Sequence, residues 1–285
     1  MELKKSKSNS KRSLNLRGKL MDLSSPLIMG ILNVTPDSFY TGSRVQSRGL
    51  ILSLAGKMLE DGADILDVGG YSTRPGASNV PVKEEVERVV EAINVIKQEY
   101  PTAVISIDTF RSEVGRKAIE AGADIINDVS GGQFDPGMFS AVAELRVPYI
   151  LMHMRGTPEN MTSLVDYDHL LNDLVDYFQK KLDTLRAFGV ADVVIDPGIG
   201  FAKTPEQGFE VLRYLDYLQV LETPVLIGVS RKSLIYKSLN ITAEEALNGT
   251  TALHMHALMN GARILRVHDV KEATETVKLY NLLGA

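Results

Sequence analysis

The sequence predicts an α/β fold, a (β/α)8 barrel of the TIM type, from three observations. Short apolar runs rich in Val, Ile and Leu recur about eight times, which is the number of strands that closes such a barrel. Segments with helical periodicity alternate with these runs. Each run ends in a side chain that can hydrogen-bond, bind a ligand or titrate, and 285 residues suit one barrel of about 250 residues with a short extension.

The clearest strand–helix unit begins at Val193–Ile195, whose β-branched side chains are typical of a strand buried on both faces. The run ends in the carboxylate of Asp196. Pro197 and Gly198 then stop the strand, and a helix-like segment begins near Pro205. This unit therefore predicts an acidic side chain at the carboxyl end of a barrel strand, where (β/α)8 enzymes carry their chemistry.

Seven further runs follow the same pattern. Each apolar run and the polar residues that end it are, in chain order, Ile28–Leu32 with Asn33, Asp64–Leu66 with Asp67, Ala103–Ile107 with Asp108, Asp124–Ile126 with Asn127 and Asp128, Val147–Met152 with His153, Val225–Val229 with Ser230, Arg231 and Lys232, and Arg263–Val267 with His268 and Asp269. Helical spacing of apolar residues predicts helices over 82–96, 111–120, 164–188, 243–260 and 272–283. Gly122 is expected to end the helix over 111–120.

The N-terminal part of the chain differs from the repeating units. Residues 1–13 are rich in Lys and Ser and are expected to form a disordered basic tail. Apolar and polar residues alternate in Leu14–Leu23 around a glycine, which predicts a β-hairpin that could plug the bottom of the barrel. Residues 14–285 are then expected to form a single domain.

Composition excludes several classes of protein. The net charge of −5 argues against a nucleic-acid partner. The sequence has no Cys, so disulfides and thiolate chemistry are absent. Apolar runs fall short of the ~18 residues that a membrane span needs, and the N-terminus lacks the apolar core of a secretory signal. We therefore expect a cytoplasmic enzyme without a membrane partner.

Four short polar side chains follow different strands and are expected to meet at one mouth, namely Asn33, Asp108, Asn127 and Asp196. A carboxylate such as Asp196 can accept two parallel N–H bonds from an aminopyrimidine edge. An amide such as Asn127 can both donate and accept. Each residue alone could equally be a helix cap or a turn residue, but four on different strands indicate a site for a heterocycle with an amidine edge and a carbonyl.

A second set is cationic and consists of Arg74, Lys232, Arg266 and His268. Arg266 and His268 are two residues apart, so a strand places them on the same side, where they could bind an oxyanion such as phosphate. A surface ion pair with Asp269 is the alternative. Lys232 follows a strand and begins a helix, and it could bind a carbonyl, stack on a ring or form a Schiff base.

Two polar loops with glycines complete the predicted mouth. They are Thr35–Phe39 with Gly42, and Tyr71–Gly76, and their length is typical of mobile lids. The helix start at Ser233 could hold a carboxylate. His153, His254 and His256 show no metal-ligand spacing, and only His153, at a strand end, is expected near the site.

Eight motifs in the same order resemble those of the dihydropteroate synthases, a pterin-binding TIM-barrel family. They are Ile28–Phe39 (IMGILNVTPDSF), Asp64–Gly76, Ser106–Thr109, Ile126–Gly131, Met152–Met154, Asp196–Lys203, Ser230–Ser233 and Arg266–Val270. The long first motif is specific, and the match runs from about Leu14 to the C-terminus. The resemblance implies a transferase of folate biosynthesis, inhibited by sulfonamides, which joins p-aminobenzoate to 6-hydroxymethyl-7,8-dihydropterin diphosphate and gives 7,8-dihydropteroate and diphosphate.

The resemblance also implies roles for individual residues. It assigns pterin binding to Asp108, Asn127, Met152, Asp196, Phe201 and Lys232. It places around the diphosphate Asn33, Thr73, Arg74, Arg266 and His268. It places around p-aminobenzoate Thr73, Pro75, Phe201, Ser230, Lys232 and Ser233. The expected catalytic residues are Lys232, Arg266, His268 and Asp37. It further implies Mg²⁺ as the cofactor, with Asn33 as its ligand, and a homodimer.

The first loop departs from the family pattern. Many members carry Ser-Asp-Gly after the Phe of this motif, whereas here Phe39 is followed by Tyr40-Thr41-Gly42. An acidic residue there could stabilise positive charge in the transition state, and Thr41 cannot do so as well. Asp37 is expected to substitute in part.

A dissociative substitution is the expected mechanism, because the dihydropterin can stabilise a cation at its exocyclic methylene while cations neutralise the departing diphosphate. Three alternatives stay open. A pterin-binding methyltransferase would share Asp108, Asn127 and Asp196 but would need no diphosphate clamp. A barrel aldolase would use Lys232 as a Schiff base. A paralogue could bind pterin without turnover, and Thr41 is the only hint in its favour.

Overall fold

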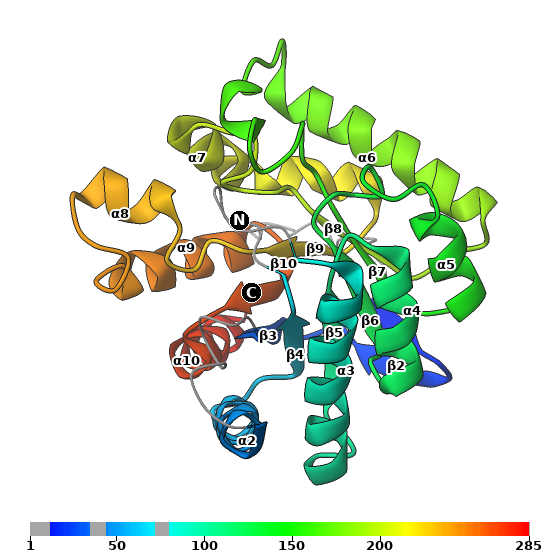
Figure 1. Ribbon diagram of the computed structural model, residues 1–285. Helices are drawn as coiled ribbons and strands as arrows, with labels where there is room; N and C mark the ends of the chain where they lie inside the picture. The colour runs from blue at the N-terminus through cyan, green and yellow to red at the C-terminus, as the bar shows by residue number, and fades with distance from the viewer. Residues whose placement is uncertain (1–11, 35–43, 72–79, 285) are drawn as a thin grey trace.

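A computed structural model describes residues 12–34, 44–71 and 80–284 of the chain, and it confirms the predicted barrel. Eight parallel strands close in the order β10-β3-β4-β5-β6-β7-β8-β9, and helices surround them (Figure 1). Their bounds are β3 (Leu27–Asn33), β4 (Ile65–Gly69), β5 (Val104–Asp108), β6 (Ile125–Asp128), β7 (Tyr149–Met152), β8 (Val193–Asp196), β9 (Val225–Ile227) and β10 (Ala262–Val267). All carboxyl ends therefore meet at one mouth.

The helices of the described residues follow the strands around the outside of the barrel. Their bounds are α2 (Arg44–Glu60), α3 (Val82–Glu99), α4 (Ser112–Ala121), α5 (Met138–Leu145), α6 (Leu170–Ala187), α7 (Pro205–Arg213), α8 (Ser233–Leu239), α9 (Leu247–Met259) and α10 (Val270–Leu282), with the short 3-10 helices η1 (Met161–Ser163) and η2 (Leu215–Leu221). Gly122 ends α4 with a φ of 117°, as expected for a glycine cap.

The helix boundaries differ from the predicted ones at several places. Periodicity did not reveal α2, which carries two glycines, or α5, which has eight residues and is too short to repeat a period. The helix predicted to begin at Leu164 begins at Leu170, after η1. The helix predicted to begin at Ala243 begins at Leu247, because Thr242 and Glu245 exchange hydrogen bonds that form a turn before it.

The barrel interior is built in layers. The floor is an apolar cluster formed by one inward side chain from most strands, among them Met29, Ile65, Ile125, Ile150, Val194, Leu226 and Ile264. Side chains alternate across a strand, so the residues two positions later face the same interior one layer nearer the mouth. That layer contains the polar side chains of Asp67, Asn127, Asp196 and Arg266 together with the apolar Met152. Because side chains alternate along each strand, these polar residues near the strand ends point into the barrel.

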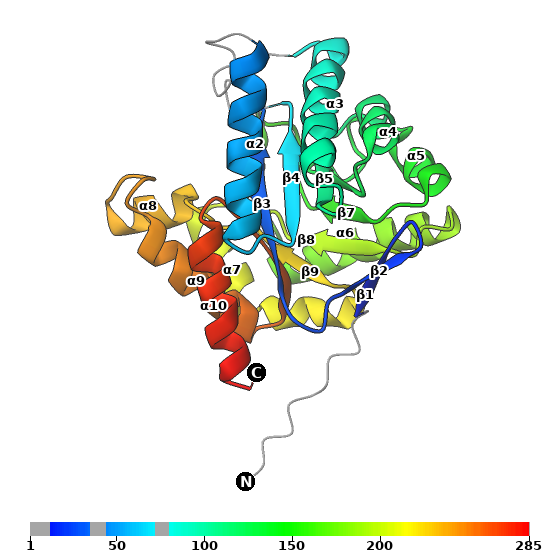
Figure 2. The same ribbon diagram turned by 90° about the horizontal axis from the view of Figure 1, so that it is seen from below.

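The N-terminal hairpin closes the floor from below. Strands β1 (Ser13–Leu16) and β2 (Lys19–Asp22) pair antiparallel, and Leu14, Leu16 and Leu23 belong to the floor cluster. Figure 2 shows the hairpin at the end of the barrel from which β3 and β4 start. The expected plug is therefore present. The expected tail falls largely on residues 1–11, which lie outside the described residues.

A larger apolar layer lies between the strands and the surrounding helices and holds the barrel rigid. Within the described ranges, no helix combines the length and apolar composition of a membrane span.

Candidate active site

Four side chains from four strands form a polar cluster directly above the apolar floor. Arg266 of β10 donates from Nε to Asp67 Oδ2 at 2.6 Å and from Nη2 to Asp108 Oδ2 at 2.6 Å. The same oxygen of Asp67 accepts a hydrogen bond from Asn127 Nδ2 at 3.1 Å. Asp67 is completely buried and Asn127 is 3% exposed. The barrel therefore joins residues up to 199 positions apart into one connected site.

Burial and close charges shift the protonation equilibria of this cluster. Burial raises the pKa of the Asp108 carboxyl, Arg266 opposes the shift, and the charge of Asp67 adds to it. Burial alone would lower the pKa of Arg266, but Asp67 and Asp108 together raise it above its ordinary value. Arg266 consequently stays cationic, and Asp108 takes up a proton more readily than an exposed carboxyl does.

Asp196 faces the mouth from the end of β8 and is 7% exposed. Its Oδ1 accepts a hydrogen bond from the backbone N–H of Gly198 at 2.8 Å. Burial raises the pKa of Asp196, while Lys232 and the Gly198 N–H oppose this shift. Gly198 has a φ of 67°, and a Cβ there would lie 2.0 Å from the carbonyl oxygen of His153. The glycine of the Asp-Pro-Gly motif is thus required by both conformation and space.

Lys232 precedes α8 and extends over the glycine loop that follows β8. Its Nζ donates to the carbonyl oxygen of Ile199 at 2.6 Å and lies 4.8 Å from the centre of the Phe201 ring. Burial lowers the pKa of Lys232 to about 8; Asp196 opposes this shift and Arg266 adds to it. Lys232 is therefore a cation that can lose its proton near neutral pH.

Gly228 separates the two cations of the site. A Cβ at this position would lie 3.8 Å from Arg266 Cβ and 3.8 Å from Lys232 Nζ. The absence of a side chain directly after β9 leaves room between them, as expected where a ligand approaches the backbone closely.

A second lysine holds the same glycine loop from the other side. Lys203 Nζ lies 3.0 Å from His153 Nδ1 and donates to the carbonyl oxygens of Gly198 and Phe201, both at 3.3 Å. Burial lowers the pKa of Lys203 to about 7; Asp196 opposes the shift, and Lys232 and Arg155 add to it. Burial, and then the charge of Lys203, also lower the pKa of His153 well below its ordinary value. His153 lies beside the site, as predicted, and its ring contacts the lysine that binds the loop carbonyls.

The loop continues into α7 through a capping box. The hydroxyl of Thr204 accepts a hydrogen bond from Gln207 N at 3.2 Å, and Gln207 Oε1 accepts one from Thr204 N at 2.9 Å. Pro205 occupies the first turn of this helix. The local sequence therefore fixes both ends of the loop that carries Ile199 and Phe201.

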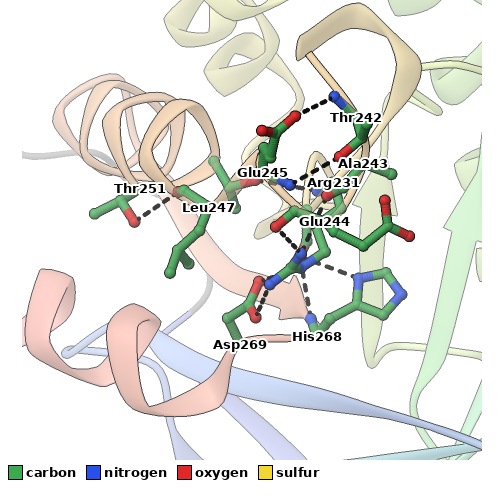
Figure 3. A network of polar contacts seen from close by, with 11 residues as sticks. Arg231, Thr242, Ala243, Glu244, Glu245, Leu247, Thr251, His268 and Asp269 are labelled. Carbon is green, nitrogen blue, oxygen red and sulfur yellow. Dashed lines mark hydrogen bonds and ion pairs between the residues drawn. The ribbon is translucent and has the colours of Figure 1, made fainter. Parts of the chain in front are cut away.

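His268 and Ser230 lie at the ends of neighbouring strands. Ser230 Oγ accepts a hydrogen bond from the backbone N–H of His268 at 3.1 Å and lies 3.1 Å from His268 Nδ1. His268 is exposed, so its imidazole can reach a ligand above Arg266. Arg266 forms its ion pairs with Asp67 and Asp108, whereas Asp269 forms two bonds with Arg231 (Figure 3).

Arg231 thus turns to the loops beside the mouth. Its Nε and Nη2 donate to Asp269 at 2.9 and 2.7 Å, and its Nη1 donates to the carbonyl oxygens of Ala243 and Glu244 at 3.1 and 2.7 Å. Figure 3 shows the guanidinium between these two segments. Arg231 therefore ties the loop that carries Ser230 and Lys232 to the loop that carries His268.

The rim supplies one amide and an apolar wall. Asn33 ends β3 and is exposed; a Cβ on Gly69 would lie 3.4 Å from Asn33 Oδ1 and 3.8 Å from Asp108 Oδ2. Asn33 therefore lies beside the polar cluster. The apolar wall is a cluster in which Phe201 packs against Val129, Met152, Met154, Met161 and Ala202.

The structure brings together the described residues that the sequence analysis assigned to the site. Asn127, Asp196 and Arg266 lie in the layer above the floor, and Asp108 contacts Arg266 from the end of β5. Lys232 reaches the same mouth from the loop after β9, and the strand ends and loops at this mouth also carry Asn33, Phe201, Ser230, Ser233 and His268. Five further candidates, Asp37, Thr41, Thr73, Arg74 and Pro75, lie outside the described residues. Asp67 was noted as a strand-end residue but not as a member of the site. Its position two residues after the floor residue Ile65 is the signal that could have identified it.

Metal-binding clusters of three or more His, Cys, Asp or Glu side chains are absent from the described part of the chain. His254 is buried in α9, and burial lowers its pKa to about 4. His256 Nε2 lies 3.0 Å from the carbonyl oxygen of Leu212. Both histidines lie on α9 and not among the strand-end residues of the mouth.

Comparisons with known proteins agree with this geometry. The profile of a family described as "Pterin binding enzyme" matches residues 29–268. The dihydropteroate synthase of Synechocystis is 44% identical over 259 residues, which cover 90% of this chain and 89% of that protein. The Yersinia pestis dihydropteroate synthase, solved as a sulfonamide drug complex, is 39% identical with a TM-score of 0.88 and coverages of 95% and 99%. The Xanthomonas albilineans dihydropteroate synthase, solved with 4-aminobenzoic acid, is 36% identical with a TM-score of 0.89 and coverages of 97% and 99%.

The family profile spans the strands that carry Asp67, Asp108, Asn127, Asp196 and Arg266, and the identity to the relatives extends over about nine-tenths of the chain. On these grounds the chain belongs to the dihydropteroate synthases, the pterin-binding transferases of folate biosynthesis.

Proposed function

We propose that the mouth of the barrel binds 6-hydroxymethyl-7,8-dihydropterin diphosphate and p-aminobenzoate together and catalyses a dissociative displacement of diphosphate. The observation that carries this assignment is the partly buried cluster of Asp67, Asp108, Asn127 and Arg266 beside Asp196 and Lys232. It offers hydrogen-bonding groups for a fused heterocycle on one side and cations for a diphosphate on the other.

The pterin is held by groups of opposite hydrogen-bonding character. The carboxylates of Asp108 and Asp196 accept N–H bonds from the ring and its amino group, and Asn127 both donates and accepts. The ammonium of Lys232 donates to the ring carbonyl, in place of or in addition to the carbonyl of Ile199. Met152 and Phe201 supply the apolar wall against which the ring packs. The arrangement supports binding of a flat, polar heterocycle with an apolar face.

The diphosphate lies toward Arg266, His268 and the rim. Arg266 stays cationic, and His268 is exposed beside it. Thr73 and Arg74, which lie outside the described residues, complete this part of the proposed site. Charge that develops on the leaving oxygens is thereby neutralised inside a partly dehydrated mouth.

Magnesium fits this side of the site through the substrate. Mg²⁺ commonly takes one or two protein oxygens and several from phosphate and water. Asn33 offers one exposed amide oxygen close to Asp108, which suits a metal ion carried in with the diphosphate. When bound, the ion would neutralise negative charge on the diphosphate.

The p-aminobenzoate is proposed to enter between Phe201 and α8. Phe201 and Pro75 would contact the aromatic ring, and Thr73, Ser230, Lys232 and Ser233 would contact its polar ends. A strong base is not required, because an arylamine is unprotonated at neutral pH. The protein therefore contributes position, charge and exclusion of water.

Two further properties follow from the family resemblance. Residues 14–285 are proposed to act as one pterin-binding domain, and two copies of the chain are proposed to form a homodimer. Light scattering of the eluting peak in size-exclusion chromatography tests the dimer, and a monomer mass at micromolar protein would contradict it.

Diphosphate release tests the proposed reaction. Release should require the pterin diphosphate, p-aminobenzoate and Mg²⁺ together, and 7,8-dihydropteroate should form in equal amount. Omission of p-aminobenzoate should leave only slow hydrolysis. Binding of both substrates without product would instead identify a pterin-binding protein without turnover.

A further inference from the structure

We propose that Asp67 is a positioning residue that sets the orientation of the Asn127 amide and holds Arg266. One buried carboxylate would then position a residue on the pterin side and a residue on the diphosphate side of the site. The proposal rests on the substrate roles proposed above for Asn127 and Arg266. Asp67 itself lies in the same inward layer as these two side chains and is completely buried.

A single oxygen makes both contacts. Asp67 Oδ2 accepts from Arg266 Nε at 2.6 Å and from Asn127 Nδ2 at 3.1 Å. These donors come from β10 and β6, whereas Asp67 is on β4. The carboxylate therefore spans the barrel interior and fixes two groups that share no hydrogen bond with each other in the described contacts.

The chemistry of a carboxylate determines which way the Asn127 amide faces. An ionised carboxylate only accepts hydrogen bonds, so the NH₂ group of Asn127 must face Asp67. The amide oxygen is then the acceptor that Asn127 can offer to a ligand. An asparagine at position 67 could both donate and accept, and the amide of Asn127 could then adopt either orientation.

The remaining polar atoms of this layer indicate that Asp67 does not serve only to hold the fold. Among the described residues, no hydrogen-bond partner lies near Asp67 Oδ1 or near Ser106 Oγ, although both atoms are buried. Asp67 and Ser106 are direct neighbours across β4 and β5. A buried carboxylate is costly to desolvate, and every hydrogen bond described for this one is made to a side chain of the proposed site.

Binding of 6-hydroxymethylpterin, which lacks the diphosphate, tests the proposal by isothermal titration calorimetry. Asp67→Asn should weaken binding about tenfold, because the amide of Asn127 loses the charged partner that fixes its orientation. In the Asn127→Ala background, Asp67→Asn should change the affinity less than about threefold, because its effect passes through Asn127. Asp64→Asn is the matched control directly before the same strand, since Asp64 accepts a hydrogen bond from Ile28 N at the opposite end of the barrel.

Each outcome has a distinct meaning. Equal loss of affinity on Asp67→Asn in both backgrounds would overturn the positioning role. Unchanged binding by Asn127→Ala alone would instead contradict the proposed pterin site. A loss in Asp64→Asn as large as that in Asp67→Asn would assign the effect to the fold.

A second pair of variants addresses folding. Removal of one partner from a buried ion pair can destabilise the protein strongly, so Asp67→Asn/Arg266→Gln is compared with Arg266→Gln. This comparison leaves Arg266 absent from both proteins, and Asn127 still loses its carboxylate partner. The double variant should bind 6-hydroxymethylpterin about tenfold more weakly than Arg266→Gln, and equal affinities would overturn the proposal.

Discussion

Two arginines at the mouth of the barrel carry the same charge but occupy different surroundings. Arg266 projects into the barrel and is bound by Asp67 and Asp108. Arg231 has a left-handed backbone with a φ of 53° and is bound by Asp269 and by two backbone carbonyls of the segment before α9. The motifs around them, Ser230-Arg231-Lys232 and Arg266-Val267-His268, both suggest anion binding.

The difference shows that one cation of the site can face the ligand while another holds the loops in place. The partners of Arg266 are inward side chains of strands, so the guanidinium is presented to a ligand in the mouth. The partners of Arg231 belong to loops, so its charge joins the segment of Lys232 to the segment of His268. We therefore expect loss of Arg266 to act on turnover directly, and loss of Arg231 to act through the placement of its neighbours.

The largest effect is expected for Arg266→Ala. Turnover should fall about 10²-fold or more, because one charge contact to the developing diphosphate is lost in the transition state. Initial rates of diphosphate release at saturating substrates measure this effect. Wild-type turnover in this variant would contradict the role of Arg266 as a diphosphate clamp.

The control for Arg266→Ala concerns stability. Its removal leaves Asp67 and Asp108 without their cation, and loss of one partner of a buried pair costs about 3–5 kcal/mol. Urea unfolding must therefore show that the variant is folded at the assay temperature. Arg266→Lys, which keeps a charge but not the two-pronged geometry, should retain more stability than Arg266→Ala and still lose turnover.

An intermediate effect is expected for Arg231→Ala. Turnover should fall about tenfold, and the free energy of unfolding should fall by about 2–3 kcal/mol, because hydrogen bonds of a charged group contribute ~1.5–3 kcal/mol. Rate measurements and urea unfolding of the same preparation give both quantities. A loss of turnover as large as that of Arg266→Ala, without any loss of stability, would show that Arg231 contacts the substrate instead.

Asp269→Asn is the matched variant on the other side of this contact. It removes the ion pair, yet Arg231 keeps its two backbone carbonyl partners. The loss in both quantities should be smaller than that of Arg231→Ala. If Asp269→Asn were the more damaging variant, the carbonyl contacts would not hold the loop as described.

The comparison also shows what the sequence could predict. Continuous apolar runs, separated by helical segments, identified all eight strands, because a parallel barrel buries both faces of each strand. They also identified Asp108, Asn127 and Asp196, because strand ends must meet at the mouth. Helix α2 was not identified, because its interior glycines and weak apolar stripe resemble a loop.

The orientation of individual side chains was less predictable. The sequence pattern placed Arg231 after one apolar run and Arg266 within another. Arg266 lies on β10, whereas Arg231 lies in the loop after β9 with a left-handed backbone. Pairing with Asp67 depends on the register between β10, β3 and β4, which is a property of the closed barrel. Ion-pair partners nearly two hundred residues apart cannot be read from local pattern.

The smallest effect is expected from a change of pH. Lys232 should titrate in the neutral to alkaline range, whereas Arg266 should not. Burial lowers the pKa of Lys232 to about 8, with Arg266 adding to this shift and Asp196 opposing it, whereas Arg266 stays protonated. As pH rises from 7 to 9, Lys232 should change from about 90% to about 10% protonated. Affinity for 6-hydroxymethylpterin should then fall several-fold, because the neutral amine is a weaker donor to the ring carbonyl.

The contribution of Lys232 to folding stability should increase with pH, whereas the affinity for the ligand should decrease. Lys232 has a lower pKa in the folded chain than the ordinary value of 10.5, so between pH 8 and 10.5 the unfolded chain binds more protons. The contribution of Lys232 to the free energy of unfolding therefore rises with pH across this window. Lys232→Arg, which stays charged, should show neither change and also reports the ligand's own titration. If its pH profiles for binding and unfolding matched those of the wild type, another group would be responsible, and Lys232 would be as permanent a cation as Arg266.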